Sequence, residues 1–90
     1  MRHEVIYINR DGARELARTK GIPAPWRLYF LAIANSDANG ESRYSEGELP
    51  LAADMRPTHL ARSIKRAIAQ DLLAEGSNPL YLKVPDAFMG

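Results

Sequence analysis

The strongest constraint on this fold is a proline-marked break between two helix-forming stretches in the second half of the chain. The sequence Glu48–Ala53 predicts a short helix, and Pro57 suits the first position of a longer helix that we expect to extend to Ala74. Between them, Asp54-Met55-Arg56 predicts a tight turn. The longer helix has one apolar stripe, formed by Leu60, Ile64, Ile68 and Leu72. The fold must therefore bury the apolar stripe of the longer helix and also accommodate a tight turn before that helix.

The opposite face of the longer helix is basic. At about 100° per residue, His59, Arg62 and Arg66 fall within roughly 60° of one another on that face. Residues 55–70 carry four Lys/Arg and no acid, whereas residues 37–54 carry five acids and one Arg. The formal net charge of +1 therefore conceals a concentrated positive segment. A polyanion responds to such a local patch, although a basic face alone is often only a solvated face.

The sequence from 45 to 85 resembles the winged helix-turn-helix DNA-binding domains of small bacterial and actinobacteriophage-type regulators. Residues that match the family lie in the first helix, the turn, the recognition helix and its exit: Leu49, Ala52, Met55, Leu60, Arg62, Ile64, Leu72 and Leu73. Two residues depart from the pattern, because Asp54 replaces the usual Gly of the turn and Pro50 lies inside the short helix. Asp tolerates left-handed backbone better than most residues, and Pro is tolerated in a first helical turn.

The predicted fold class is α+β, mainly α: a winged helix-turn-helix with a small antiparallel β-wing and an N-terminal strand–helix extension. We divide the chain into this extension, the winged domain and a tail, at residues 1–22, 23–85 and 86–90. Within the extension, the sequence predicts a strand at 4–9 and a helix at 11–20.

The core of the winged domain is expected around an aromatic helix at 26–34, which is apolar on more than one side. A strand at 80–84 should follow the recognition helix, with Leu80, Leu82 and Val84 on one face. Its partner strand must come from the segment around Tyr44 or from residues 5–8.

The resemblance implies that the 57–74 helix enters the major groove of double-stranded DNA. The expected base contact is Arg62, because bidentate Arg–guanine pairing is the commonest specific contact; it is supplemented by Thr58, His59 and Ser63. The expected phosphate contacts are Arg56, Lys65 and Arg66. Ser77 and Asn78 are expected at the wing tip, against the backbone or the minor groove. For His59 an ordinary surface position on the helix is the alternative.

Catalysis is not expected from this sequence. The chain has 90 residues and no cysteine, and its histidines, His3 and His59, lie far apart in the sequence. It has no Gly-rich phosphate loop and no apolar run of the length of a signal peptide or a membrane span. We therefore predict no enzyme activity, metal, cofactor, small-molecule ligand or membrane contact, and a cytoplasmic, nucleoid-associated location.

The expected role is transcriptional regulation, or DNA organisation and replication in a phage or mobile element. A chain this short usually needs two copies to read a full DNA site, so we expect a homodimer or cooperative assembly. The alternative is a winged-helix protein-interaction module without direct DNA binding, which would use the acidic 37–54 segment or the apolar 26–34 helix. The charge pattern of the recognition helix discriminates between DNA binding and protein binding. A winged-helix domain that binds only proteins has no reason to exclude acids from positions 56–70.

Overall fold

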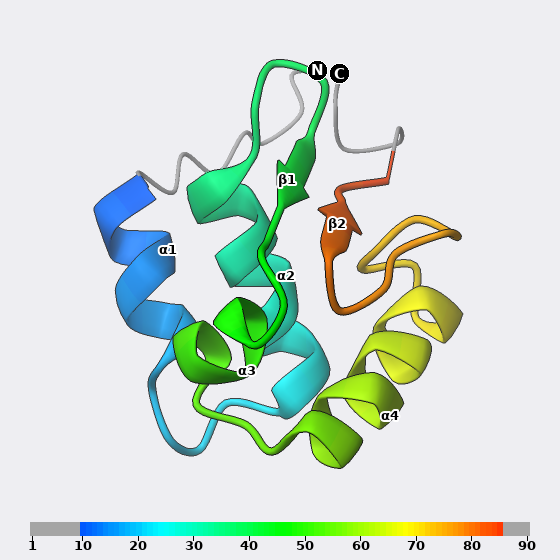
Figure 1. The fold of residues 1–90 in the computed structure, drawn as a ribbon. Helices are drawn as coiled ribbons and strands as arrows, with labels where there is room; N and C mark the ends of the chain where they lie inside the picture. Colours follow the sequence, from blue (N-terminus) through cyan, green and yellow to red (C-terminus); the bar gives the residue numbers. More distant parts are fainter. Residues whose placement is uncertain (1–9, 86–90) are drawn as a thin grey trace.

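Helix α2 (Ala24–Asn35) is the central element of this protein, whose computed structural model describes residues 10–85. It contacts the helices α1 (Arg10–Ala17), α3 (Glu48–Ala53) and α4 (Pro57–Ala69) and the strand β1 (Glu41–Arg43), which pairs with β2 (Tyr81–Lys83) (Figure 1). This part of the chain is therefore a small α+β domain that is mainly helical. The strand predicted at 4–9 and the tail at 86–90 lie outside the described residues.

The aliphatic side of α2 forms the centre of the core. Leu28, Leu31 and Ala32 are buried together with residues of every other described helix and of the sheet. The aromatic side chains of this helix, around which the sequence predicts the core, are only partly buried and pack against its outer side. The Trp26 side chain is 41% exposed, and its ring lies 5.8 and 6.2 Å from the rings of Tyr29 and Phe30. The aromatic cluster therefore covers the core rather than filling it.

Helices α3 and α4 begin where the sequence predicted, but α4 ends at Ala69 instead of Ala74. Asp71 adopts left-handed backbone with φ 61°. The Asp71 N–H donates to Ile68 (3.0 Å) and the Leu72 N–H to Ala67 (2.8 Å), which closes the helix in a Schellman motif. A continued helix would direct Leu73 to the basic side, about 100° beyond Leu72. Ending the helix instead buries both leucines.

The same motif closes α3. Asp54 has φ 55° and ψ 52°, and the N–H groups of Asp54 and Met55 donate to Leu51 (3.2 Å) and Pro50 (2.9 Å). Left-handed backbone at this position explains why a glycine is usual there and why aspartate is accepted. The prediction that Asp54 is compatible with the turn is confirmed.

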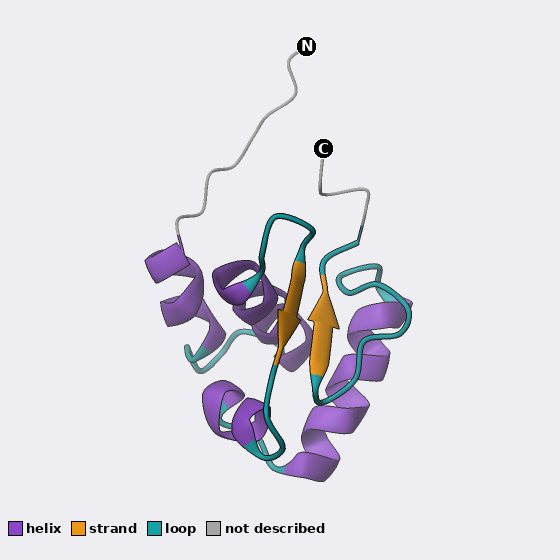
Figure 2. Cartoon of the chain, turned by 45° about the horizontal axis from the view of Figure 1, so that its top comes forward, coloured by secondary structure: helices purple, strands orange, loops and turns teal. Residues whose placement is uncertain are grey.

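The two strands form an antiparallel pair in which Ser42 lies opposite Leu82 (Figure 2). The partner of β2 is thus the segment before Tyr44, one of the two sources that the sequence allowed. The chain after α4 returns along the other edge of β2, where the Ala74 N–H donates to Lys83 (2.8 Å). Leu82 and Val84 are buried as expected.

Leu80 does not share their face, because it lies in a turn rather than in the strand. Asn78 and Tyr81 exchange backbone hydrogen bonds of 2.7 and 3.0 Å around Pro79 and Leu80. Strand alternation therefore does not apply to Leu80, whose side chain is 48% exposed. The tip of the hairpin is formed by Pro79 and Leu80.

A half-buried contact of Arg27 joins three helices. Its Nε donates to the Ala17 carbonyl at the end of α1 (2.9 Å), and its Nη2 donates to the Ala53 carbonyl at the end of α3. Carbonyls at helix C-termini lack intrahelical donors and carry the negative end of the helix dipole, so a guanidinium satisfies them well. The sequence did not indicate this role, because the two carbonyls come from distant segments.

Replacing Arg27 by Met is expected to lower the free energy of unfolding by about 2–3 kcal/mol, because two carbonyls lose a charged donor. Arg27→Lys should lose less, since an ammonium still satisfies one of them. Urea unfolding followed by circular dichroism measures both. The control is Arg18→Met, an exposed position where a change within about 0.5 kcal/mol is expected. Equal stability of Arg27→Met and Arg18→Met would contradict this role.

Asp71→Gly is expected to raise the free energy of unfolding by about 0.5 kcal/mol, because glycine adopts φ 61° without strain. Gln70→Gly, one residue earlier, should lower the free energy of unfolding by a similar amount. Gln70 has φ −95°, so glycine relieves no strain there and only increases the conformational entropy of the unfolded chain. Thermal and urea unfolding of the two variants should therefore shift in opposite directions.

Candidate nucleic-acid interface

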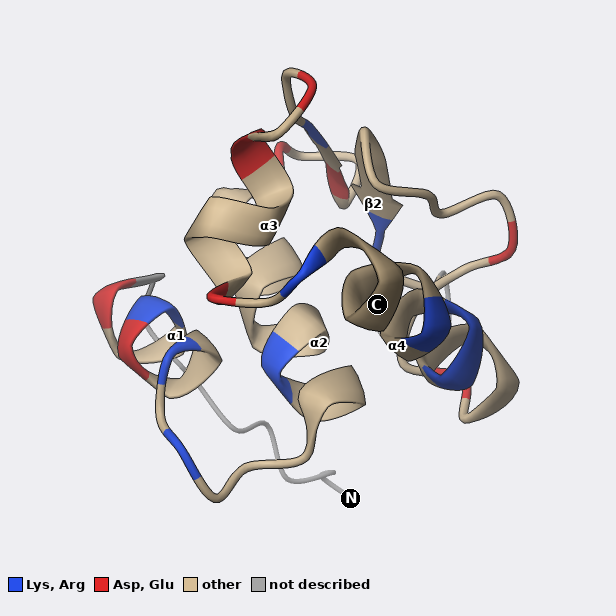
Figure 3. Ribbon diagram, turned by 60° about the horizontal axis from the view of Figure 1, so that its bottom comes forward, with Lys and Arg blue, Asp and Glu red and all other residues tan. Residues whose placement is uncertain are grey.

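The exposed face of α4 gathers most of the predicted DNA contacts. Its apolar side packs on the core through Leu60, Ile64 and Ala67. The opposite side is exposed and carries Thr58, His59, Arg62, Lys65 and Arg66. Figure 3 shows the Lys and Arg positions of α4 on the side away from α2. The amphipathic pattern thus sets the basic face, defined by these five residues, toward solvent.

The cations of this face have no acidic partner within the described part of the chain. The ion pairs found there join Arg14 to Asp11 (3.3 Å) and Arg43 to Glu41 (3.5 Å). Arg62 and Arg66 are instead like-charged neighbours one helical turn apart, an arrangement that costs an isolated helix about 0.2–0.5 kcal/mol. A bound polyanion would remove that repulsion, whereas solvent only screens it.

A small hollow lies within the basic face. It has a volume of about 270 Å³ and is lined by His59, Arg62, Ser63 and Arg66. Three of these side chains are exposed, and the fourth, Ser63, is 2% exposed. The hollow therefore presents donors from three successive turns of one helix over a polar floor, which suits a phosphate or a base edge.

Two of the residues predicted to contact DNA are buried rather than exposed. Ser63 lies three residues after Leu60 and four before Ala67, so the helical period places it in the buried stripe. Ser77 is 8% exposed, and its Oγ accepts the Lys83 N–H (3.2 Å), which ties the returning loop to β2. Neither residue is exposed like those of the basic face, and Ser63 lines only the floor of the hollow.

Asn78 is exposed, but its side chain is engaged within the hairpin turn. Its Oδ1 accepts the Leu80 N–H (2.8 Å), and its Nδ2 donates to the Gly76 carbonyl (3.2 Å). The hairpin tip itself is apolar. The hairpin is therefore a weaker candidate for DNA contact than the sequence suggested, and the basic face on α4, together with exposed Arg56 at the start of that helix, is the candidate interface.

Among residues 10–85, two ionisable groups outside this interface have shifted pKa values. The pKa of Asp37 is lowered because its carboxylate accepts the backbone N–H groups of Glu41 (3.1 Å) and Asn39 (2.8 Å). Burial raises the pKa of Tyr29. Asp37 shapes the loop before β1 and Tyr29 belongs to α2, so neither group contributes chemistry to the basic face.

Comparison with protein-family models, with curated proteins and with solved structures gave no match to this chain. Within residues 10–85, no helix has the length and apolar character needed to cross a membrane. The same residues contain no group of three or more His, Cys, Asp or Glu side chains arranged to hold a metal ion.

Proposed function

We propose that this protein binds double-stranded DNA as a winged helix-turn-helix domain, with α4 in the major groove. The observation that carries the proposal is the basic face of α4, which is exposed, lacks acidic partners among the described side chains and lies on the second of two helices joined by a tight turn. An α-helix fits the width of the major groove, and Lys/Arg side chains at its surface neutralise phosphates.

The order of elements supports the same proposal. A core helix, a short strand, two helices and a returning hairpin follow one another as α2, β1, α3, α4 and the 74–83 segment. A winged helix-turn-helix domain is expected to have this order when the partner strand of the wing comes from the segment around Tyr44, one of the two sources that the sequence allowed. The hairpin is short and irregular, which is consistent with binding that depends mainly on α4.

Within this proposal the exposed side chains divide by position. Arg62, in the middle of the basic face, is assigned to base recognition, with Thr58 and His59 nearer the start of the helix. Arg56, Lys65 and Arg66 are assigned to phosphates, where they set the register on the duplex. The role that follows is that of a small regulator of transcription, or of a DNA-organising or replication protein of a phage or mobile element.

The proposal is tested by fluorescence anisotropy of a labelled mixed-sequence duplex at several salt concentrations. The wild type is expected to bind with a dissociation constant on the order of micromolar at low salt, and to weaken steeply as salt rises. Arg62→Ala/Arg66→Ala should weaken binding by about tenfold or more. The salt dependence should also fall, by about one released counterion for each phosphate that the variant no longer neutralises.

The matched control is Arg18→Ala/Lys20→Ala, which removes the same charge from exposed positions at the end of α1. It should change the affinity much less, because α1 and α4 lie on opposite sides of α2 (Figure 3). An equal loss in both double variants would show attraction by net charge alone. Absence of binding at low salt by folded wild-type protein would overturn the proposal and favour a protein-interaction module.

A further inference from the structure

The outer side of α3 exposes a leucine that the core does not use. Leu51 is 80% exposed, more than Trp26 or Leu80, the other exposed large hydrophobic residues among those described. Residues two apart in a helix point in nearly opposite directions, so burial of Leu49 forces Leu51 outward. A leucine that is 80% exposed buries little apolar surface in the fold, and covering it with another surface is favourable.

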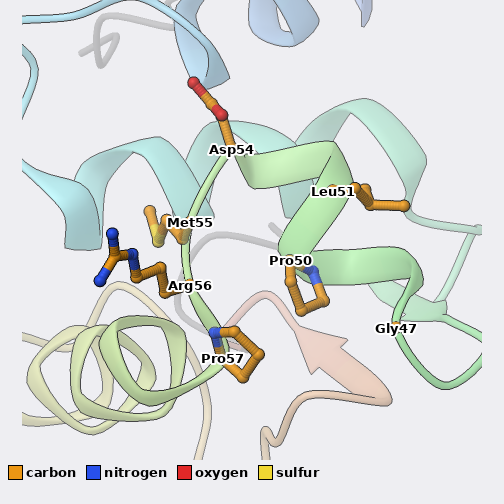
Figure 4. A pocket seen from close by; sticks show the side chains of 7 residues that line it. All are labelled: Gly47, Pro50, Leu51, Asp54, Met55, Arg56 and Pro57. Atoms are coloured by element: carbon orange, nitrogen blue, oxygen red, sulfur yellow. The ribbon is translucent and has the colours of Figure 1, made fainter.

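A hollow of about 600 Å³ opens beside this leucine, between α3 and the start of α4. It is lined by Gly47, Pro50, Leu51, Asp54, Met55, Arg56 and Pro57. Figure 4 shows the rings of Pro50 and Pro57 facing this space from the two helices, while Leu51 projects away from α3. The two prolines and the left-handed Asp54 restrict the backbone around the hollow. The surface therefore combines a projecting apolar side chain with a preformed apolar recess.

The charges at the edge of the hollow are balanced. Asp54 and Arg56 have opposite signs, and neither forms an ion pair within the described part of the chain. The neighbouring basic face of α4, by contrast, would repel a second copy. In a two-fold contact between identical chains, the same surface must be complementary to itself. Here the projecting leucine can pack into the hollow of the other copy, and Asp54 of one copy can face Arg56 of the other. A strongly acidic or basic partner would gain little from this balanced edge.

We propose that the α3 surface, defined by Leu51 and the lining of this hollow, binds a second copy of the chain when two copies occupy neighbouring sites on DNA. Leu51 of each copy enters the hollow of the other. The DNA part of this inference rests on the proposed function. Stable interfaces bury roughly 1,200–2,000 Å², and we expect a contact centred on one leucine of each copy to bury less and to form weakly in free solution. On one duplex, the high effective concentration of the second copy makes the same contact effective.

The test compares duplexes of about 12 and about 24 base pairs, which offer roughly one and two helical turns of site. For the wild type, the second copy on the longer duplex is expected to bind at least about tenfold more tightly than a lone copy, because the contact covers a leucine side chain of each copy. Leu51→Ser should abolish this cooperativity without changing affinity for the short duplex, and Leu51→Met should retain it. Leu80→Ser is the control, because it makes the same change at another exposed leucine.

Sedimentation equilibrium of the free proteins at up to about 1 mM separates this inference from the proposed function, since weak association becomes visible at such concentrations. A wild-type dimer that Leu51→Ser removes and Leu80→Ser keeps would support the contact even if no DNA bound. Binding to the short duplex without cooperativity on the long one would overturn it while leaving DNA binding intact. A wild type that stays monomeric and non-cooperative, or a dimer unaffected by Leu51→Ser, would also overturn it.

Discussion

The contact of Arg27 with the ends of two helices is the interaction on which the rest of the structure depends. Its guanidinium joins the final carbonyls of α1 and α3 to the central helix α2. Helix termini always leave carbonyls without intrahelical donors, and burying such groups unsatisfied costs about 1–3 kcal/mol each. One planar, permanently charged side chain satisfies both carbonyls and holds the ends of α1 and α3 against α2. Because α3 leads directly into the turn before α4, this contact also helps to position α4.

Local backbone chemistry then sets the direction of α4. Asp54 turns the chain through left-handed backbone, and Pro57 starts the next helix two residues after Met55, whose side chain is buried. The apolar stripe of α4 packs on the core and its basic face remains in solvent. Asp71 ends the helix in the same way and sends Leu72 and Leu73 back into the core. Two aspartates in left-handed backbone therefore define both ends of the segment proposed to bind DNA.

Two surfaces with different physical character meet at the start of α4. The basic face suits a polyanion because its cations repel one another, whereas the α3 surface is apolar and balanced in charge. Arg56 lies at the boundary and lines the hollow. If DNA binds the basic face and a second copy of the chain binds the α3 surface, each of these two binding events favours the other. The basic face then provides affinity for DNA, and the α3 surface provides cooperativity.

The sequence by itself determined the features that depend on neighbouring residues. Proline and helical period predicted α3, the turn, the start of α4 and its basic face, because these follow from backbone restriction and from side chains three or four positions apart. Only the tertiary structure decided where α4 ends, that Ser63 lies in the buried stripe, that Leu80 lies in a turn, and that Arg27 joins α1 to α3. Burial and long-range hydrogen bonds connect segments that are distant in the sequence, so no local pattern specifies them.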